Sequence, residues 1–218
     1  IKLPKVDTKP SAEKARIYLV DVPRAAQTQF RVGGLTGLTY DATGEYYRAM
    51  LMNYVLGGSF NSRLNINLRE DKGWTYGARS GFSADKYSGS FSFSSGIRAD
   101  ATDSALYEVM NELTQYAKGG ITNDELLFMK SALGQRDALL YETGFQKAGF
   151  IGRILRYDLP ANYVDEQNRI LANLTKAEVD ALAAKWIKPD NMSILLVGDK
   201  NKILPGLKRL NYEIVELD

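Results

Sequence analysis

The chain has 218 residues, with 28 Lys and Arg against 26 Asp and Glu, and it contains neither histidine nor cysteine. Without cysteine there is no disulfide framework, thiol nucleophile or thiolate zinc site, and without histidine there is no imidazole base and no His-containing metal site. A net charge of +2 gives no electrostatic argument for nucleic acid or an anionic membrane as a partner. The side chains that remain for catalysis or polar binding are carboxylates, Lys, Arg, Tyr, Ser and Thr.

Length and composition bound the architecture. A chain of this length usually forms one large domain or two small ones, and 44% hydrophobic with 25% charged residues is typical of a globular protein. The longest apolar runs, such as residues 193–197, are far shorter than the ~20 residues that span a bilayer. Residues 1–15 carry Lys and Pro with little periodicity and predict a linker or arm. Residues 16–218 predict a single domain. Because the chain begins with Ile1, we expect it to be either a processed protein or a piece cut from a longer polypeptide.

Two strands are predicted near the N-terminus. Residues 15–22 are β-branched and aromatic and end at Pro23, and residues 27–32 alternate polar and apolar up to Gly33-Gly34. Because only a short turn separates the two, we expect them to pair as an antiparallel hairpin.

After residue 40 the spacing of apolar residues changes from every second residue to every third or fourth residue. Residues 41–56 predict a helix that ends at Gly57-Gly58, and residues 61–69 predict a second helix. After Gly73 the strand pattern returns over residues 74–82 and 90–95, which we expect to form another hairpin.

The rest of the chain is mainly helical. Capping boxes at Thr122/Glu125 and Thr175/Glu178 mark two helix starts, because the hydroxyl and the carboxylate satisfy free N–H groups of the first turn. The remaining predictions are helices over 100–119, 122–141, 144–157, 161–171, 175–186 and 204–210, a buried strand over 192–197 and an edge strand over 212–217. Strands in hairpins and helices in blocks favour an α+β fold, with one mainly antiparallel sheet covered by helices on one face.

Few motifs point to chemistry. The doublets Gly33-Gly34, Gly57-Gly58 and Gly119-Gly120 fit neither a phosphate-binding loop nor a dinucleotide fingerprint, so they are interpreted as turns and helix caps. The acidic pairs Glu70-Asp71 and Asp124-Glu125 have no companion acid that the sequence places nearby.

One segment, residues 56–77, combines a helix end, a second helix and a glycine-hinged entry into a strand. Arg69 at the helix end and Tyr76 on the strand can converge on one spot, where a guanidinium and a phenol would offer donors to a carbonyl or an oxyanion. The alternative is structural: Arg69 pairs with Glu70 or Asp71, and Tyr76 packs in the sheet.

The same segment, GGSFNSRLNINLREDKGWTYGARS, resembles the signature of the metal-free C-terminal domains of the insulinase/pitrilysin family of zinc peptidases. The resemblance extends over about residues 12–218. It includes IYLVDVP at residues 17–23, the two capping-box starts, LPANY at 159–163 and KPDN at 188–191.

The resemblance implies a metallopeptidase half-domain with the mitochondrial-processing-peptidase-like fold. Members of this family pair two similar domains around a chamber. One carries zinc on an HxxEH motif, and the other supplies an Arg and a Tyr to the substrate. Arg69 and Tyr76 match those two positions. Residues 49–53, Ala-Met-Leu-Met-Asn, stand where HxxEH would be and cannot replace the zinc ligands.

The resemblance therefore implies a non-zinc-binding domain of a zinc endopeptidase that acts on peptides. No cofactor is expected in this chain, zinc is expected in an HxxEH-bearing partner domain, and the isolated chain is expected to be inactive. The alternative is a catalytically dead structural or assembly subunit of the same fold. A small-ligand module has no motif behind it. A bacterial periplasm is the expected compartment.

Overall fold

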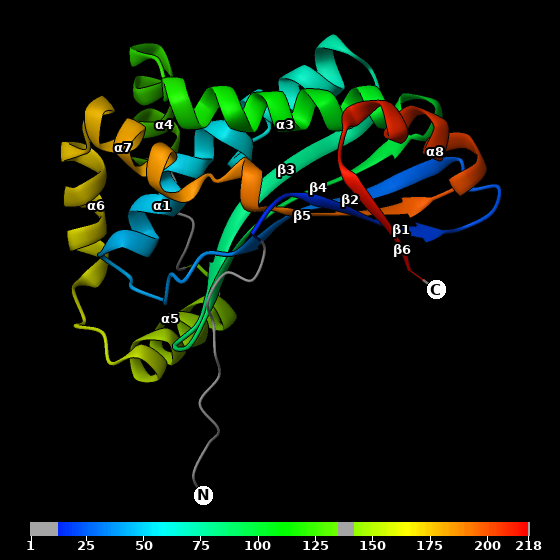
Figure 1. The fold of residues 1–218 in the computed structure, drawn as a ribbon. Coiled ribbons are helices and arrows are strands. Elements are labelled where there is room, and N and C mark those ends of the chain that lie inside the picture. Colours follow the sequence, from blue (N-terminus) through cyan, green and yellow to red (C-terminus); the bar gives the residue numbers. More distant parts are fainter. Residues whose placement is uncertain (1–12, 135–141, 218) are drawn as a thin grey trace, which may run out of the picture.

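The computed structural model describes residues 13–134 and 142–217, and its centre is a six-stranded sheet (Figure 1). The strands lie in the order β3-β4-β2-β5-β1-β6. Their bounds are β1 Arg16–Asp21, β2 Gln27–Leu35, β3 Thr75–Ala84, β4 Gly89–Arg98, β5 Ser193–Gly198 and β6 Glu213–Leu217. Neighbours from β3 to β5 are antiparallel, whereas β1 runs parallel to both β5 and β6. The α+β class and the mainly antiparallel sheet are confirmed.

Helices cover one face of this sheet. In Figure 1, α3, α7 and α8 lie above the strands, and α5 lies apart, near the end of the β3–β4 hairpin. The α-helices are α1 Glu45–Asn53, α2 Arg63–Asn65, α3 Thr102–Gly119, α4 Asn123–Gly134, α5 Gly144–Tyr157, α6 Tyr163–Asn173, α7 Lys176–Trp186 and α8 Lys200–Leu207. The π-helices are η1 Tyr54–Gly58 and η2 Ile66–Asp71, and short 3₁₀ turns are η3 Ala99–Ala101, η5 Pro189–Asn191 and η6 Lys208–Leu210.

The core lies between the sheet and the helices. On β2 the even-numbered side chains Thr28, Phe30 and Val32 are buried under the helices, and the intervening polar side chains are exposed. This period-two alternation is expected for an antiparallel strand with one face on the core and one face open. Most strand side chains on the open face of β2, β3 and β4 are therefore polar.

The predicted hairpin of the first two strands is wrong. β5 lies between β1 and β2 and pairs with both, through Ile17↔Ile194 on one side and Phe30↔Leu196 on the other. The chain from β1 to β2 therefore crosses one strand position. β1 lies next to the edge strand β6, and Ile17 and Leu19 are its two buried residues, which face the helices.

The predicted end of the second strand at Gly33-Gly34 is also wrong. β2 continues to Leu35 and pairs with β4 along its whole length. A Cβ atom at Gly33 would lie 2.0 Å from the carbonyl oxygen of Phe91, so glycine here permits close approach of the neighbouring strand instead of ending it.

Most other predicted elements are confirmed. β3 and β4 form the second hairpin, and both capping boxes are present at the starts of α4 and α7. The last helix begins at Lys200, four residues earlier than predicted, because Asp199 caps it by accepting the N–H of Asn201. Residues 135–141 of the predicted 122–141 helix, and residues 1–12 of the predicted arm, lie outside the described residues. No helix within residues 13–134 and 142–217 is long and apolar enough to cross a membrane.

Candidate functional site

The segment that the sequence singles out folds as a helix followed by a sharp turn into the edge strand β3. α2 continues into the π-helix η2, which ends at Asp71 and is capped by Lys72, and Gly73 adopts the left-handed region with φ of +65°. The Trp74 N–H donates to the Leu68 carbonyl at 3.0 Å and closes the turn. π-Helical turns are uncommon and are found disproportionately at functional sites.

Arg69 lies on η2, just before this turn. Its guanidinium donates to the Glu70 carboxylate, and its central carbon lies 4.3 Å from the centroid of the Phe60 ring. A cation above an aromatic face is favourable, and both contacts hold the guanidinium near the surface. The side chain keeps 32% of its surface exposed. The pair with Glu70 that the structural alternative predicts is therefore present in the structure.

Tyr76 is the second residue of β3 and, unlike Arg69, has no side-chain partner among the described residues. Its side chain is 91% exposed, and its hydroxyl makes no hydrogen bond with any residue that the structure describes. A tyrosine usually buries much of its ring, and this one leaves both the ring and the hydroxyl open to solvent. The structural alternative, packing in the sheet, is wrong for Tyr76.

A β-bulge holds the backbone on either side of Tyr76. The β3–β4 register shifts between Thr75 and Ala78. The Thr75 hydroxyl accepts the Gly77 N–H at 3.1 Å and lies 2.9 Å from the Ser95 hydroxyl, which in turn donates to the Gly77 carbonyl. Bulges re-aim side chains. This one presents the phenol of Tyr76 from a fixed backbone.

Buried Asn65 ties α2 to the same bulge. Its amide nitrogen donates to the Phe60 carbonyl at 2.7 Å, and its amide oxygen accepts the Ala78 N–H at 2.9 Å. The residue is 3% exposed. Asn65 thereby links the loop that carries Phe60, the ring beneath Arg69, to the strand that carries Tyr76.

Arg63 anchors the start of α2 against α3 and α4. Its guanidinium forms a bidentate pair with Glu125 at 2.6 and 2.7 Å, donates to the Gly120 carbonyl at 3.0 Å and lies 5.1 Å from the centroid of the Tyr116 ring. Burial alone would raise the pKa of Glu125, but hydrogen bonds from Arg63 and Thr122 outweigh it and hold the pKa below its ordinary value.

We expect this network to make stability depend on acidity. A carboxyl with a lower pKa in the folded chain stabilises the fold above its ordinary pKa of 4.5 and loses that contribution as the pH falls below it. Glu125→Gln should therefore lower the thermal midpoint at about pH 7 and lower it less at about pH 3.5. Calorimetry of both proteins at both pH values measures this. A difference that stays constant between the two would contradict the assignment.

The free edge of β3 is occupied by side chains in place of another strand. The Ser80 carbonyl accepts from the Asn53 amide at 2.8 Å, the Phe82 carbonyl accepts from the Tyr46 hydroxyl at 3.4 Å, and Asn65 takes the Ala78 N–H. Alternate residues of an edge strand point their backbone groups outward, and here three of those groups are satisfied from α1 and α2.

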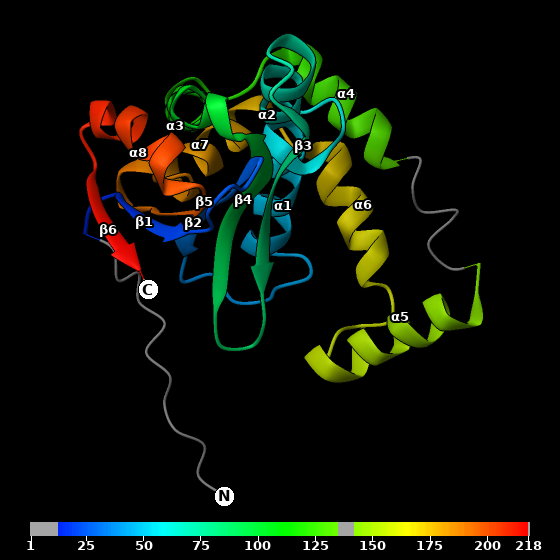
Figure 2. The same ribbon diagram turned by 90° about the vertical axis from the view of Figure 1, so that its right-hand side faces the viewer.

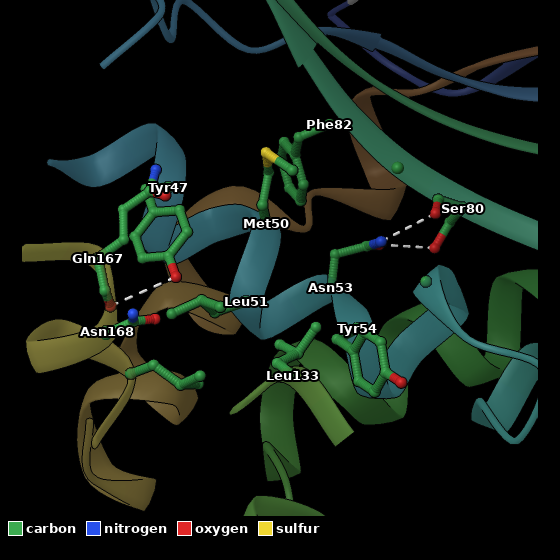
Figure 3. A pocket seen from close by; sticks show the side chains of 13 residues that line it. Tyr47, Met50, Leu51, Asn53, Tyr54, Ser80, Phe82, Leu133, Gln167 and Asn168 are labelled. Carbon is green, nitrogen blue, oxygen red and sulfur yellow. Dashed lines mark hydrogen bonds between the residues drawn. The ribbon is translucent and has the colours of Figure 1, made fainter. Parts of the chain in front are cut away.

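A pocket of about 430 Å³ lies beside this edge, between α1, α4, α6 and β3 (Figure 3). In Figure 3 the Asn53 amide points at Ser80, and Met50 lies beside Phe82. This part of α1 stands where the resemblance places HxxEH, and its donor set does not fit zinc: Met50 offers a thioether and the Asn53 amide is already bonded. No group of three or more His, Cys, Asp or Glu side chains suited to a metal occurs among the described residues.

The structure thus brings Arg69 and Tyr76 to the two sides of one turn, and within the described residues no hydrogen bond joins their side chains. The residues that fix this turn, Asn65, Thr75 and Ser95, were not found from the sequence. Asn65 could have been identified from the sequence, because it is a polar amide beside the apolar stripe of Leu64 and Leu68.

Residues 1–133 match the family model described as "Peptidase M16 inactive domain". A crystal structure of a peptidase M16 inactive domain from Pseudomonas fluorescens is 30% identical, with a TM-score of 0.79, over 90% of this chain and 46% of that one. A protease structure from Helicobacter pylori has a TM-score of 0.73 at 19% identity, over 87% of this chain and 45% of that one, which is a likeness of fold.

Among curated proteins, the "uncharacterized zinc protease YmxG" of Bacillus subtilis (strain 168) is 35% identical over 80 residues, which are 37% of this chain and 20% of that protein. The chain spans less than half the length of each of these relatives. The match over residues 1–133 covers more than half of the chain and confirms the resemblance read from its sequence. The chain therefore belongs to the inactive domains of the peptidase M16 family of zinc proteases.

Proposed function

We propose that this chain is the half of a zinc endopeptidase that assists catalysis without binding the metal. In this proposal it faces an HxxEH-bearing domain, closes the chamber around a peptide and donates hydrogen bonds to that peptide from Arg69 and Tyr76. The zinc of the partner domain would polarise the scissile carbonyl and activate water.

The observation that carries the proposal is the phenol of Tyr76. It is 91% exposed and unbonded within the described chain, yet its backbone is fixed by the Thr75–Ser95 bulge and by Asn65. A side chain that is free at its tip and rigid at its base is preorganised as a donor for a group supplied from outside.

Placing donors on the wall opposite the metal has a physical consequence. A preorganised donor in a dry site is worth about 3 kcal/mol to the transition state, because it needs no reorganisation when charge develops. Such a site is complete only when the two halves close, which couples capture of the peptide to exclusion of water. Arg69 would have to exchange Glu70 for the substrate during that closure.

The test uses the chain alone and then with a partner. The isolated chain is expected to bind no stoichiometric zinc and to cleave no peptide, and addition of the HxxEH-bearing domain should produce peptidase activity. Metal analysis by mass spectrometry and cleavage of a quenched fluorescent peptide measure the two. One zinc per purified chain would overturn the proposal.

The second candidate is a structural or assembly subunit of the same fold. The pair between Arg69 and Glu70 is the observation in its favour, because it gives the guanidinium a partner within the chain. This candidate predicts that the assembled protein folds and dimerises normally and that its turnover, if any, does not depend on Tyr76.

A further inference from the structure

The open face of the sheet carries two arginines that lie opposite one another across a single serine. Arg31 on β2 and Arg79 on β3 are each in register with Ser94 on β4, the strand between them. Adjacent strands are about 4.8 Å apart, so the backbones of the two arginines lie roughly 10 Å from each other. Both side chains can therefore reach one small anion between them. Both line the same cleft of about 260 Å³.

Most N–H donors of these two guanidiniums have no hydrogen-bond partner within the described residues. Arg31 donates to the Phe30 carbonyl at 2.8 Å and makes no ion pair, and Arg79 makes neither a hydrogen bond nor an ion pair with any residue in the described ranges. An arginine carries five N–H donors in a planar fork that matches a carboxylate. Most of those donors are directed to solvent here.

The three strands that form the cleft carry no acidic residue. β2, β3 and β4 together include three arginines and not one Asp or Glu. Only the third of them, Arg98, has an acidic partner among the described residues, the exposed Asp100 just beyond its strand. In a chain whose formal charges nearly balance, this face is a local excess of positive charge.

The floor of the cleft is polar and partly free of side chains. Ser94 offers a hydroxyl between the two guanidiniums, and Gln29 lies across Gly96 on the neighbouring pair of strands. A Cβ atom at Gly96 would lie 3.0 Å from the Gln29 amide nitrogen, so the glycine leaves room for that amide. The cleft therefore offers charged and neutral donors around a space that suits a carboxylate.

We propose that Arg31 and Arg79 bind a carboxylate of a peptide, either an acidic side chain or a free C-terminus. Arg79 lies three residues beyond Tyr76 on the same strand, which is about 10 Å at the rise of a β-strand. A carboxylate held there would lie a few residues from the peptide group that Tyr76 contacts. The inference depends on the proposed function only in taking peptide as the ligand of this face.

Binding to the full 218-residue chain tests the site without any turnover. The probe is a fluorescein-labelled, C-terminally amidated octapeptide with two central Glu residues, and its counterparts have Gln in their place with either an amidated or a free C-terminus. We expect tighter binding of the Glu peptide or of the free C-terminus, measured by fluorescence anisotropy, and which of the two is preferred identifies the source of the carboxylate.

The variant Arg31→Gln/Arg79→Gln should weaken binding of the preferred peptide about tenfold, the loss expected for two exposed charge-assisted pairs. Arg16→Gln/Arg98→Gln removes the same charge from the same sheet, but these two arginines are paired with Glu213 and Asp100, so it should change affinity far less.

The proposal is overturned if all three peptides bind equally or if none binds. It is also overturned if the two double variants lose the same affinity. Because no turnover is measured, a failure here is separate from a failure of the catalytic role of Tyr76. Circular dichroism of both variants verifies that the sheet is intact.

Discussion

Tyr76→Phe in the complete assembly, with the HxxEH-bearing domain present, is expected to lower kcat about 100- to 1000-fold, because it removes a single preorganised donor from the transition state. The substitution deletes one oxygen from a side chain that contacts almost nothing in its own chain, so the fold should not change. Steady-state kinetics on a quenched peptide measure the effect.

Tyr87→Phe is the matched control. Tyr87 is a second exposed tyrosine, in the turn at the other end of the β3–β4 hairpin, and its loss of a hydroxyl should leave kcat unchanged. If Tyr76→Phe and Tyr87→Phe have the same turnover as the parent, Tyr76 has no part in catalysis.

Arg69 permits a sharper comparison than substitution alone. Arg69→Ala should lower turnover to a similar degree, whereas Glu70→Gln, which removes the intrachain partner and leaves the guanidinium, should not. If the only task of Arg69 were to pair with Glu70, the two variants would behave alike. Equal losses from both would therefore favour the structural subunit.

Arg63→Ala is expected to cause the largest loss of stability, about 2–3 kcal/mol, because it leaves the half-buried carboxylates of Glu125 and Glu112 without their shared cation. For a chain of this size that loss corresponds to a thermal midpoint lower by roughly 4–12 °C. Differential scanning calorimetry measures it.

Arg98→Ala is the control for this prediction. Arg98 also forms a bidentate pair, with Asp100, but both side chains are mostly exposed, and exposed pairs contribute little. Its thermal midpoint should equal that of the parent. A change at Arg63 no greater than that at Arg98 would contradict the anchoring role.

Local patterns in the sequence predicted the elements well and their arrangement less well. Alternation over residues 90–95 and the boxes at Thr122 and Thr175 are signals within a few residues, and the structure confirms all three. The place of β5 between β1 and β2 depends on contacts between segments more than 150 residues apart. No local pattern specifies which distant strand enters that gap.

The candidate site, too, was predictable only where it depends on residues close together in the sequence. The spacing of Arg69 and Tyr76 on either side of Gly73 is visible in the sequence, and the structure places the two residues on either side of the turn at Gly73. The surroundings of the two side chains were not predicted. The Phe60 ring under Arg69 lies in the same segment, but its contact depends on how the π-helical turn folds back, and the Ser95 hydroxyl beneath the bulge comes from β4. The π-helical turns of η1 and η2 have no propensity signal of their own, since their residues also suit an α-helix.

The occupied edge of β3 also bears on how this half-domain behaves when it is not assembled. Uncovered edge strands recruit further strands and are common starting points for aggregation. Asn53, Asn65 and Tyr46 take the outward hydrogen-bonding positions of Ala78, Ser80 and Phe82, so another chain would have to displace them before it could add to the sheet. The edge of the sheet nearest the candidate site is thereby protected against the addition of a strand from another chain.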